Sequence, residues 1–303
     1  MSENFEASFD EQLQAIQAEA EDIHADLAHL PAALSQPQGI TPFCFDVPDP
    51  DLTAEDPASI LAGLAWEPRS RERAATMMAD YCDTQATEMS LLGGIADKQQ
   101  EAAARILAVL VCAEESAINI FHHECNRLSP EETAYNHRAL REIESEERVH
   151  NWLIHQARGH LPVPDDVPQI RRRTRRLFMR VASRDLGTHF ARITGLDSGV
   201  CISLTALLSS GDVRKHTGFA RLIKHIRRDE ATHVKKSRDH AVALGFSEDS
   251  FHDAYDLTRT GMVGMLEPIA GSFEDMGVDP DRLFGRLLRF QGSRMPDSVE
   301  LND

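Results

Sequence analysis

The chain has 303 residues, which is enough to bury a large hydrophobic core, and it carries a formal net charge of −17. Aromatic residues make up only 6% of the chain and alternating runs of β-branched residues are scarce, so the composition predicts an all-α protein. The negative charge argues against a nucleic-acid partner, because such binding needs a basic surface.

The first 57 residues differ in character from the rest of the chain. Residues 8–30 have the pattern of an acidic amphipathic helix, and the many prolines from Pro31 to Pro57 predict an extended arm. We therefore expect an N-terminal helix and arm over 1–57, followed by a single helical domain over 58–303. Within that domain the central bundle is expected at about 98–245.

The first helical hairpin of this bundle is expected to begin near Lys98. Its second helix has a start signal at Ser129-Pro-Glu-Glu132, where an N-cap serine is followed by proline and two acids, and Gly159 can end it. The inward stripe of the first helix is Leu107, Leu110, Val111, Glu114, Ile118 and Phe121.

A proline-rich linker from Leu161 to Pro168 leads to a second hairpin. Its helices are expected at about Gln169–Ser209 and Lys215–Gly245, with a turn at Gly211-Asp212 between them. Two further helical segments, near 249–270 and 280–291, complete the domain.

The localisation expected from the sequence is cytoplasmic. No run of about 18 apolar residues is evident, and the acidic N-terminus does not resemble a secretory signal, so no membrane partner is expected. The cysteines are odd in number and form no Cys-x-x-Cys pair, which predicts reduced, mostly buried thiols. They are Cys44, Cys82, Cys112, Cys125 and Cys201.

The basic cluster from Arg171 to Arg176 is an exception in this acidic chain. We interpret it first as the solvated start of a helix. A docking patch for an acidic partner or a phosphorylated substrate is the alternative.

Two Glu-x-x-His motifs, Glu147-Arg-Val-His150 and Glu230-Ala-Thr-His233, carry the main functional signal. Each follows a lone acid by the same interval, because Glu114 to Glu147 and Asp197 to Glu230 both span 33 residues. The midpoint of the first interval falls at Pro130, and that of the second lies close to Gly211-Asp212, and both are turn signals. Folding each segment into a hairpin would therefore bring each acid level with its motif. The pattern predicts a dinuclear metal site with four carboxylates and two imidazoles.

The matched spacing matters because single motifs arise by chance. With 24 Glu and 14 His in the chain, about one Glu-x-x-His is expected at random, and a third copy lies at Glu21-Asp-Ile-His24. That copy has no acid 33 residues before it, so we do not assign it to the site.

The chemistry of the ligand set favours iron or manganese. Residues three apart share one helix face, so each Glu and His pair can bind one ion. Mixed carboxylate and imidazole ligands suit iron and manganese, and carboxylates can bridge two ions. Glu146 and Asp229 each precede a ligand, and each can accept the second N–H of an imidazole and set its tautomer.

At these residues, over roughly 98–245, the chain resembles the ferritin-like di-iron carboxylate superfamily, in its oxygenase and oxidase branch. Glu114-Glu-Ser-Ala-Ile118 looks like the motif of the family's first helix, Glu147-Arg-Val-His150 like the second, and Arg228-Asp-Glu-Ala-Thr-His233 like the fourth. The resemblance implies a ferritin-like four-helix bundle with flanking helices. It implies two iron ions, with Mn/Fe or di-Mn as alternatives, held by Glu114, Glu147, His150, Glu230 and His233. Glu115 is the rival of Glu114, but it would face the polar side of its helix.

The third helix departs from the family pattern, because it contains no Glu. Asp185 and Asp197 are the candidates, and the equal spacing favours Asp197. The glycines of Gly195-Leu-Asp-Ser-Gly199 leave two other interpretations open: a turn in which Asp197 caps a helix, or a helix distorted at the site.

The leading functional prediction is an oxygenase or oxidase that uses O2 and an external electron donor or reductase to oxidise a small organic substrate. A metal-storage or peroxide-scavenging protein is the main alternative, and an N-oxygenase acting on an amine is a further one. Ile154 stands where a radical-forming tyrosine would be expected, and Ile226 stands where N-oxygenases of the family carry an extra His. The oligomeric state, a homodimer included, is left open.

Overall fold

Every secondary-structure element in the described part of the protein is a helix. The computed structural model describes residues 72–79, 96–128, 134–215 and 217–289, and these contain no strand. All of them belong to the second of the two units into which the chain divides, Asp49–Asp303. The all-α class expected from the composition is therefore confirmed for this part. The arm at 1–57, the motif at Glu21 and the start signal at Ser129 lie outside the described residues.

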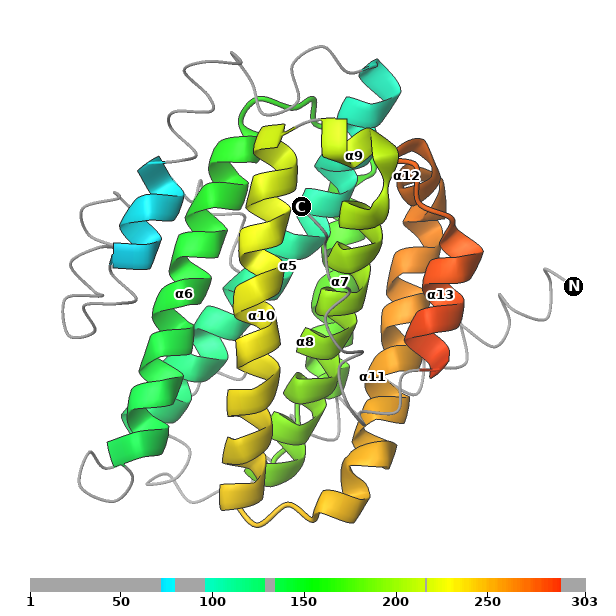
Figure 1. Ribbon diagram of the computed structural model, residues 1–303. Coiled ribbons are helices and arrows are strands. Elements are labelled where there is room, and N and C mark those ends of the chain that lie inside the picture. The colour runs from blue at the N-terminus through cyan, green and yellow to red at the C-terminus, as the bar shows by residue number, and fades with distance from the viewer. Residues whose placement is uncertain (1–71, 80–95, 129–133, 216, 290–303) are drawn as a thin grey trace, which may run out of the picture. The chain divides into compact units, whose positions relative to one another are not determined.

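Two long helices, α5 (Asp97–Arg127) and α6 (Ala134–Arg158), form the first hairpin and pack against each other (Figure 1). An alanine-rich run on α5 lets the two helices approach closely, since Ala102, Ala103 and Ala108 are fully buried. The expected end of the second helix at Gly159 is confirmed to within one residue.

The second hairpin consists of α8 (Leu186–Ser209) and α10 (Thr217–Ala243), joined through the short helix α9 (Gly211–Lys215). These two helices make the most extensive helix contact in the described structure. Gly245 ends α10 in the left-handed conformation, at φ 91°, and the amide of Phe246 donates back to the carbonyl of Ala241. This glycine cap fixes the exit of the chain from the hairpin.

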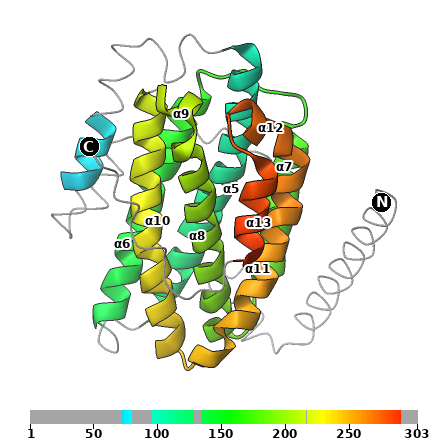
Figure 2. The same cartoon turned by 45° about the vertical axis from the view of Figure 1, so that its right-hand side comes forward.

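The two hairpins meet where α6 packs on α10, and further helices cover the other side (Figures 1 and 2). Helix α7 (Val167–Val181) packs on α5, and α11 (Phe251–Leu266) runs along α8 on the side away from α6. The chain continues from η1 (Glu248–Ser250) into α11, then through η2 (Glu267–Ile269), α12 (Ala270–Asp275) and α13 (Pro280–Arg289).

The single helix expected over Gln169–Ser209 is wrong, because the chain breaks into α7 and α8 between Val181 and Leu186. Asp185 caps α8, and its Oδ1 accepts a hydrogen bond from the Thr188 amide at 2.7 Å. The cap satisfies an amide at the start of α8 that would otherwise lack a partner. Because of this break, α7 packs on α5 while α8 packs on α10.

Helix α8 is the apolar centre of the described bundle. By length and composition it would be able to cross a bilayer, with a mean hydropathy of 1.3, which the sequence expectation overlooked. However, 67% of its most apolar 18-residue stretch is buried inside the protein, and α8 contacts α10, α11 and α13. Its hydropathy is therefore that of a core helix.

Three of the five cysteines lie in the described part, and all three are buried free thiols, as expected. Burial raises the pKa of Cys125 to about 12 and also raises that of Cys201. These side chains therefore act as small core residues.

Candidate metal centre

Five predicted residues meet between the two hairpins: an acid of α5 and a Glu-x-x-His pair from each of α6 and α10. The sixth, Asp197 of α8, is near enough that the charge of Glu230 raises its pKa. Glu114, Glu147, His150, Glu230 and His233 are all buried to 95% or more. Ligand atoms of Glu114, Glu147, His150 and Glu230 lie within 4.8 Å of one another, so this group could hold a metal ion.

Both imidazoles turn the same nitrogen inward. Nδ1 of His150 lies 3.4 Å from Oε2 of Glu114, and Nδ1 of His233 lies 3.0 Å from Oε1 of Glu147. The two rings are 6.1 Å apart between centroids. The inward nitrogens are therefore the ones available to a bound cation.

Two carboxylates lie between the imidazoles. Glu147 turns Oε2 toward His150, at 3.4 Å from Nδ1, and its other oxygen toward His233. Oε1 of Glu230 is nearly equidistant from the two inward nitrogens, at 3.8 Å and 3.7 Å. Glu147 and Glu230 thus occupy positions shared by both halves of the site.

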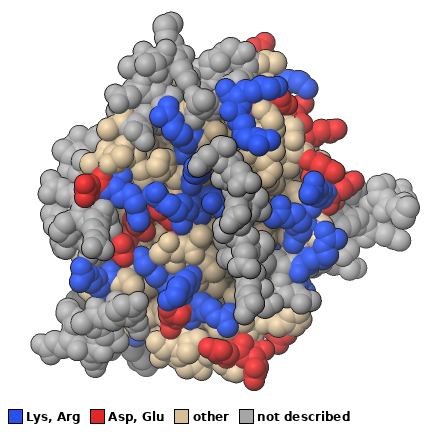
Figure 3. All heavy atoms as spheres, in the orientation of Figure 1, with Lys and Arg blue, Asp and Glu red and all other residues tan. Residues whose placement is uncertain are grey.

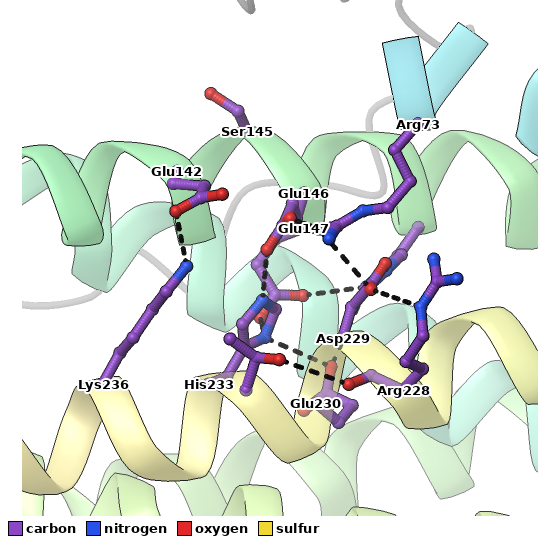
Figure 4. A network of polar contacts seen from close by, with 12 residues as sticks. Arg73, Glu142, Ser145, Glu146, Glu147, Arg228, Asp229, Glu230, His233 and Lys236 are labelled. Atoms are coloured by element: carbon purple, nitrogen blue, oxygen red, sulfur yellow. Dashed lines mark hydrogen bonds and ion pairs between the residues drawn. The ribbon is translucent and has the colours of Figure 1, made fainter. Parts of the chain in front are cut away.

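The outward nitrogens are held by acids of the opposite helix (Figure 4). Nε2 of His150 on α6 donates to Asp229 on α10 at 3.3 Å, and Nε2 of His233 on α10 donates to Glu146 on α6 at 3.0 Å. The acid before each Glu ligand does contact an imidazole, and the contact crosses between helices. A proton held at Nε2 leaves the Nδ1 lone pair free to bind a metal.

Arg73 is part of this arrangement and was missed from the sequence. From the short helix at 72–79, its guanidinium pairs with Glu146 and lies 3.5 Å from Oδ1 of Asp229 (Figure 4). One cation thereby contacts both acids that hold the imidazoles. Nothing in the sequence pattern around Arg73 signals this role, because it lies 41 residues before Glu114.

The structure separates the two third-helix candidates. Asp185 is an exposed helix cap, as described above, whereas Asp197 lies in the middle of α8. The side chain of Asp197 is half-buried, but its Oδ2 is shielded from solvent. After burial itself, the charges of Glu230 and His233 have the largest effects on its pKa. The interpretation of Asp197 as a helix cap is therefore wrong, and its role as a ligand stays a prediction that its neighbours favour.

No helix distortion accompanies Asp197, since α8 is α-helical throughout its length. The flanking glycines serve a different contact. A Cβ at Gly195 would collide with Thr258 and lie 2.9 Å from Cδ1 of Tyr255, and one at Gly199 would collide with Met262. Gly195 and Gly199 thus allow α11 to approach α8 closely.

Glu115, the rival of Glu114, points away from the centre. It lies 3.4 Å from Nη2 of Arg171 and 3.5 Å from Nη2 of Arg175. Arg171 is itself buried, so this part of the basic cluster on α7 anchors that helix to α5.

The centre holds more negative charge than its cations balance. Burial and the Glu147 carboxylate raise the pKa of Glu114 well above its usual range, and burial and Glu230 do the same for Asp197. Burial opposes charging of the two imidazoles, but Glu114 outweighs it at His150 and Glu147 outweighs it at His233, so both His pKa values rise. A divalent cation would take the place of protons among these groups.

The hydrogen bonding of the inward polar atoms also indicates a cation site. Oε2 of Glu114, Oε2 of Glu147, Oδ2 of Asp197 and Nδ1 of both His150 and His233 have no hydrogen-bond partner within the described structure. Buried polar atoms are rarely left unpaired, because each costs about 1–3 kcal/mol. Such atoms of Glu114, Glu147, His150 and His233 gather in one buried cluster, which fits a site built for cations.

Comparison with known proteins adds no relative: no family model or curated protein matches the sequence, and no solved structure matches the fold. The functional inference therefore depends on the geometry of this centre.

Proposed function

We propose that the protein is a non-haem di-iron oxygenase or oxidase with a ferritin-like bundle formed by α5, α6, α8 and α10. The observation that carries the proposal is the buried cluster in which ligand atoms of Glu114, Glu147, His150 and Glu230 lie within 4.8 Å of one another. Donors of this hard, carboxylate-rich kind suit iron or manganese better than zinc.

Two ions fit the arrangement better than one. Glu114 lies beside His150. The strongest electrostatic interactions of Asp197 are with Glu230 and His233. Each half of the site therefore has an acid and an imidazole of its own. Glu147 and Glu230 contact both imidazoles and would serve both halves of the site. Glu114 and His150 would hold an ion in one half, and Asp197 and His233 would hold an ion in the other.

Two bound iron ions would supply the binding and reduction of O2, with Mn/Fe or di-Mn as the alternative pairs. The protein's own groups do the rest. Asp229 and Glu146 hold the protons at Nε2 of the imidazoles, which keeps both Nδ1 atoms oriented inward. The buried setting keeps water from the site.

An apolar cavity between the helices that carry Glu114 and Asp197 supports the proposal that the substrate is organic. It has a volume of about 40 Å³ and is lined by apolar side chains with the single exception of Ser203. Ala113 and Leu196 line it, and they directly precede Glu114 and Asp197 in the chain. The cavity thus borders the helices that carry Glu114 and Asp197. Its volume exceeds the roughly 10–15 Å³ that a single water needs, so it has room for a small apolar molecule.

The cavity also bears on the main alternative, which is metal storage or peroxide scavenging. A storage protein needs a polar path for ions, whereas this space is apolar and lies among α5, α7, α8 and α11. Oxidation of an amine remains within the proposal as one choice of organic substrate.

The test is the reaction of the iron-loaded protein with O2. We expect O2 consumption that depends on an electron donor and, with small apolar substrates, products that carry label from ¹⁸O2 or have lost hydrogen. Continued iron uptake with growth of an iron mineral would instead establish storage. A folded, iron-loaded protein that does not react with O2 would refute the proposal.

A further inference from the structure

Helix α10 has an unusual distribution of charge for so acidic a chain. It carries seven Lys or Arg residues and three Asp or Glu residues. Two of those three acids, Asp229 and Glu230, are buried in the metal centre. The solvent side of the helix is therefore strongly basic.

Four exposed basic residues form a stripe along this side. Arg221, Lys224, Arg228 and Lys235 are spaced by three, four and seven residues, which places them on one face of the helix. The stripe spans 14 residues, or about 21 Å along the axis. Figure 3 shows Lys and Arg side chains predominating among the described residues on the face that α10 presents. We call these four residues the α10 basic stripe.

The stripe is connected to the metal centre by side-chain contacts (Figure 4). Nε of Arg228 lies 3.3 Å from Oδ1 of Asp229, and the other oxygen of Asp229 accepts the hydrogen bond from Nε2 of His150. The side chain of Arg228 is 50% exposed, so one carboxylate and one imidazole separate the surface from the inward nitrogen.

We propose that the α10 basic stripe is the docking surface for a small acidic electron-carrier protein. The inference rests on the proposed function, which needs electrons from outside the chain. Two encounters with a reduced one-electron carrier would each oxidise one carrier molecule and reduce one ferric ion. The short contact chain through Asp229 and His150 explains why such a partner would dock at this helix.

Charge favours a small acidic protein over a nucleic acid as the partner, and geometry favours α10 over the basic cluster on α7 as the docking surface. A long polyanion such as a nucleic acid would extend beyond the stripe and meet the field of a chain whose net charge is −17. A small acidic protein needs only the local stripe. The basic cluster on α7 is a poorer surface, because Arg171 is buried and α7 packs mainly on α5 and α11.

The first experiment measures binding and needs no turnover. The probe is an oxidised plant-type [2Fe–2S] ferredoxin, titrated calorimetrically into the iron-loaded protein. We expect micromolar binding at low salt that weakens at least tenfold in about 0.5 M salt, because screening removes most of the charge attraction. The double variant Arg221→Glu/Lys224→Glu should weaken binding at low salt by at least about tenfold.

The matched control is Arg172→Glu/Arg176→Glu, which reverses two exposed charges on α7. It should bind ferredoxin like the wild type. No binding by the wild type, or equal weakening in both variants, would overturn the docking site. So would tighter binding of a single-stranded oligonucleotide that Arg221→Glu/Lys224→Glu abolishes.

The second experiment separates failure of the docking site from failure of the proposed function. Reduction of the ferric protein is followed with reduced ferredoxin and, separately, with reduced methyl viologen, a small cationic reductant. We expect the α10 variant to slow reduction by ferredoxin at least about tenfold and to leave reduction by methyl viologen unslowed. A protein that neither donor reduces would refute the proposed function, whereas ferredoxin reduction that is unchanged in the variant would refute only the docking site.

Discussion

Nε2 of His150 on α6 donates a hydrogen bond to Oδ2 of Asp229 on α10, at 3.3 Å, across the interface between the two hairpins. The contact from His233 to Glu146 runs in the opposite direction, at 3.0 Å. Each hairpin thus orients the imidazole of the other. The two contacts therefore join the metal centre to the interface between the hairpins.

Asp229→Asn should weaken metal binding about 10- to 100-fold, because a neutral amide holds the Nε2 proton less strongly than a carboxylate does. The measurement is an anaerobic competition titration of Fe(II) against a chelator. Asp239→Asn is the control, since Asp239 is exposed on the same helix and pairs with Lys235. Unchanged affinity in Asp229→Asn would show that this hydrogen bond does not support the site.

Asp197→Ala should lose metal and O2 reactivity as severely as Glu230→Ala, because each removes one of the four buried carboxylates. Asp185→Ala should keep both and lose only its helix cap, at a cost of about 1 kcal/mol in the free energy of unfolding. Metal analysis and denaturant unfolding of the three variants check this. A wild-type metal content in Asp197→Ala would remove Asp197 from the site.

The core of this site could be predicted from the sequence because the same number of residues separates the lone acid from the Glu-x-x-His motif in both hairpins. The 33-residue interval identified Glu114 and Asp197, and it chose Asp197 over Asp185 without any knowledge of the break before α8. The order of the helices followed from proline, glycine and apolar periodicity in the same way.

Contacts between distant segments could not be predicted in this way. Whether Glu146 would reach His150 or His233 depends on how α6 docks on α10, and helical periodicity describes only one helix at a time. Arg73 belongs to a separate short helix, and a lone arginine has no spacing to identify its partner. The break between α7 and α8 contains neither glycine nor proline to signal it, and an aspartate such as Asp185 can serve either as a helix cap or as a ligand.

Gly195→Ala should destabilise the protein by about 1–3 kcal/mol, because the new methyl group would collide with Thr258 and press on Tyr255 across the contact between α8 and α11. The matched control is Gly264→Ala on α11, where no atom lies within 4 Å of the added Cβ. That variant should be neutral or more stable by up to about 1 kcal/mol. Denaturant unfolding of both apo-proteins measures the difference. Equal stabilities would mean that the two helices do not pack this closely.

The dependence of stability on pH should reveal His189. Burial, assisted by Arg192, lowers the pKa of His189 to about 4, from the ordinary value of 6.5. The unfolded chain therefore takes up this proton below pH about 6.5 while the folded chain does not, so stability falls as pH falls from about 6.5 to 4. The full effect is about 3 kcal/mol. His189→Gln should show a smaller decline over this range, as measured by denaturant unfolding at several pH values, and an identical decline would contradict the assignment.

The most direct measurement of the central claim is the number of iron ions bound per chain. The purified protein is loaded anaerobically with ferrous iron, freed of excess metal, and analysed for iron and protein. Six ligands arranged around two shared carboxylates predict about two ions per chain. A value near one or zero in a folded sample, with manganese also failing to fill the site, would contradict the account.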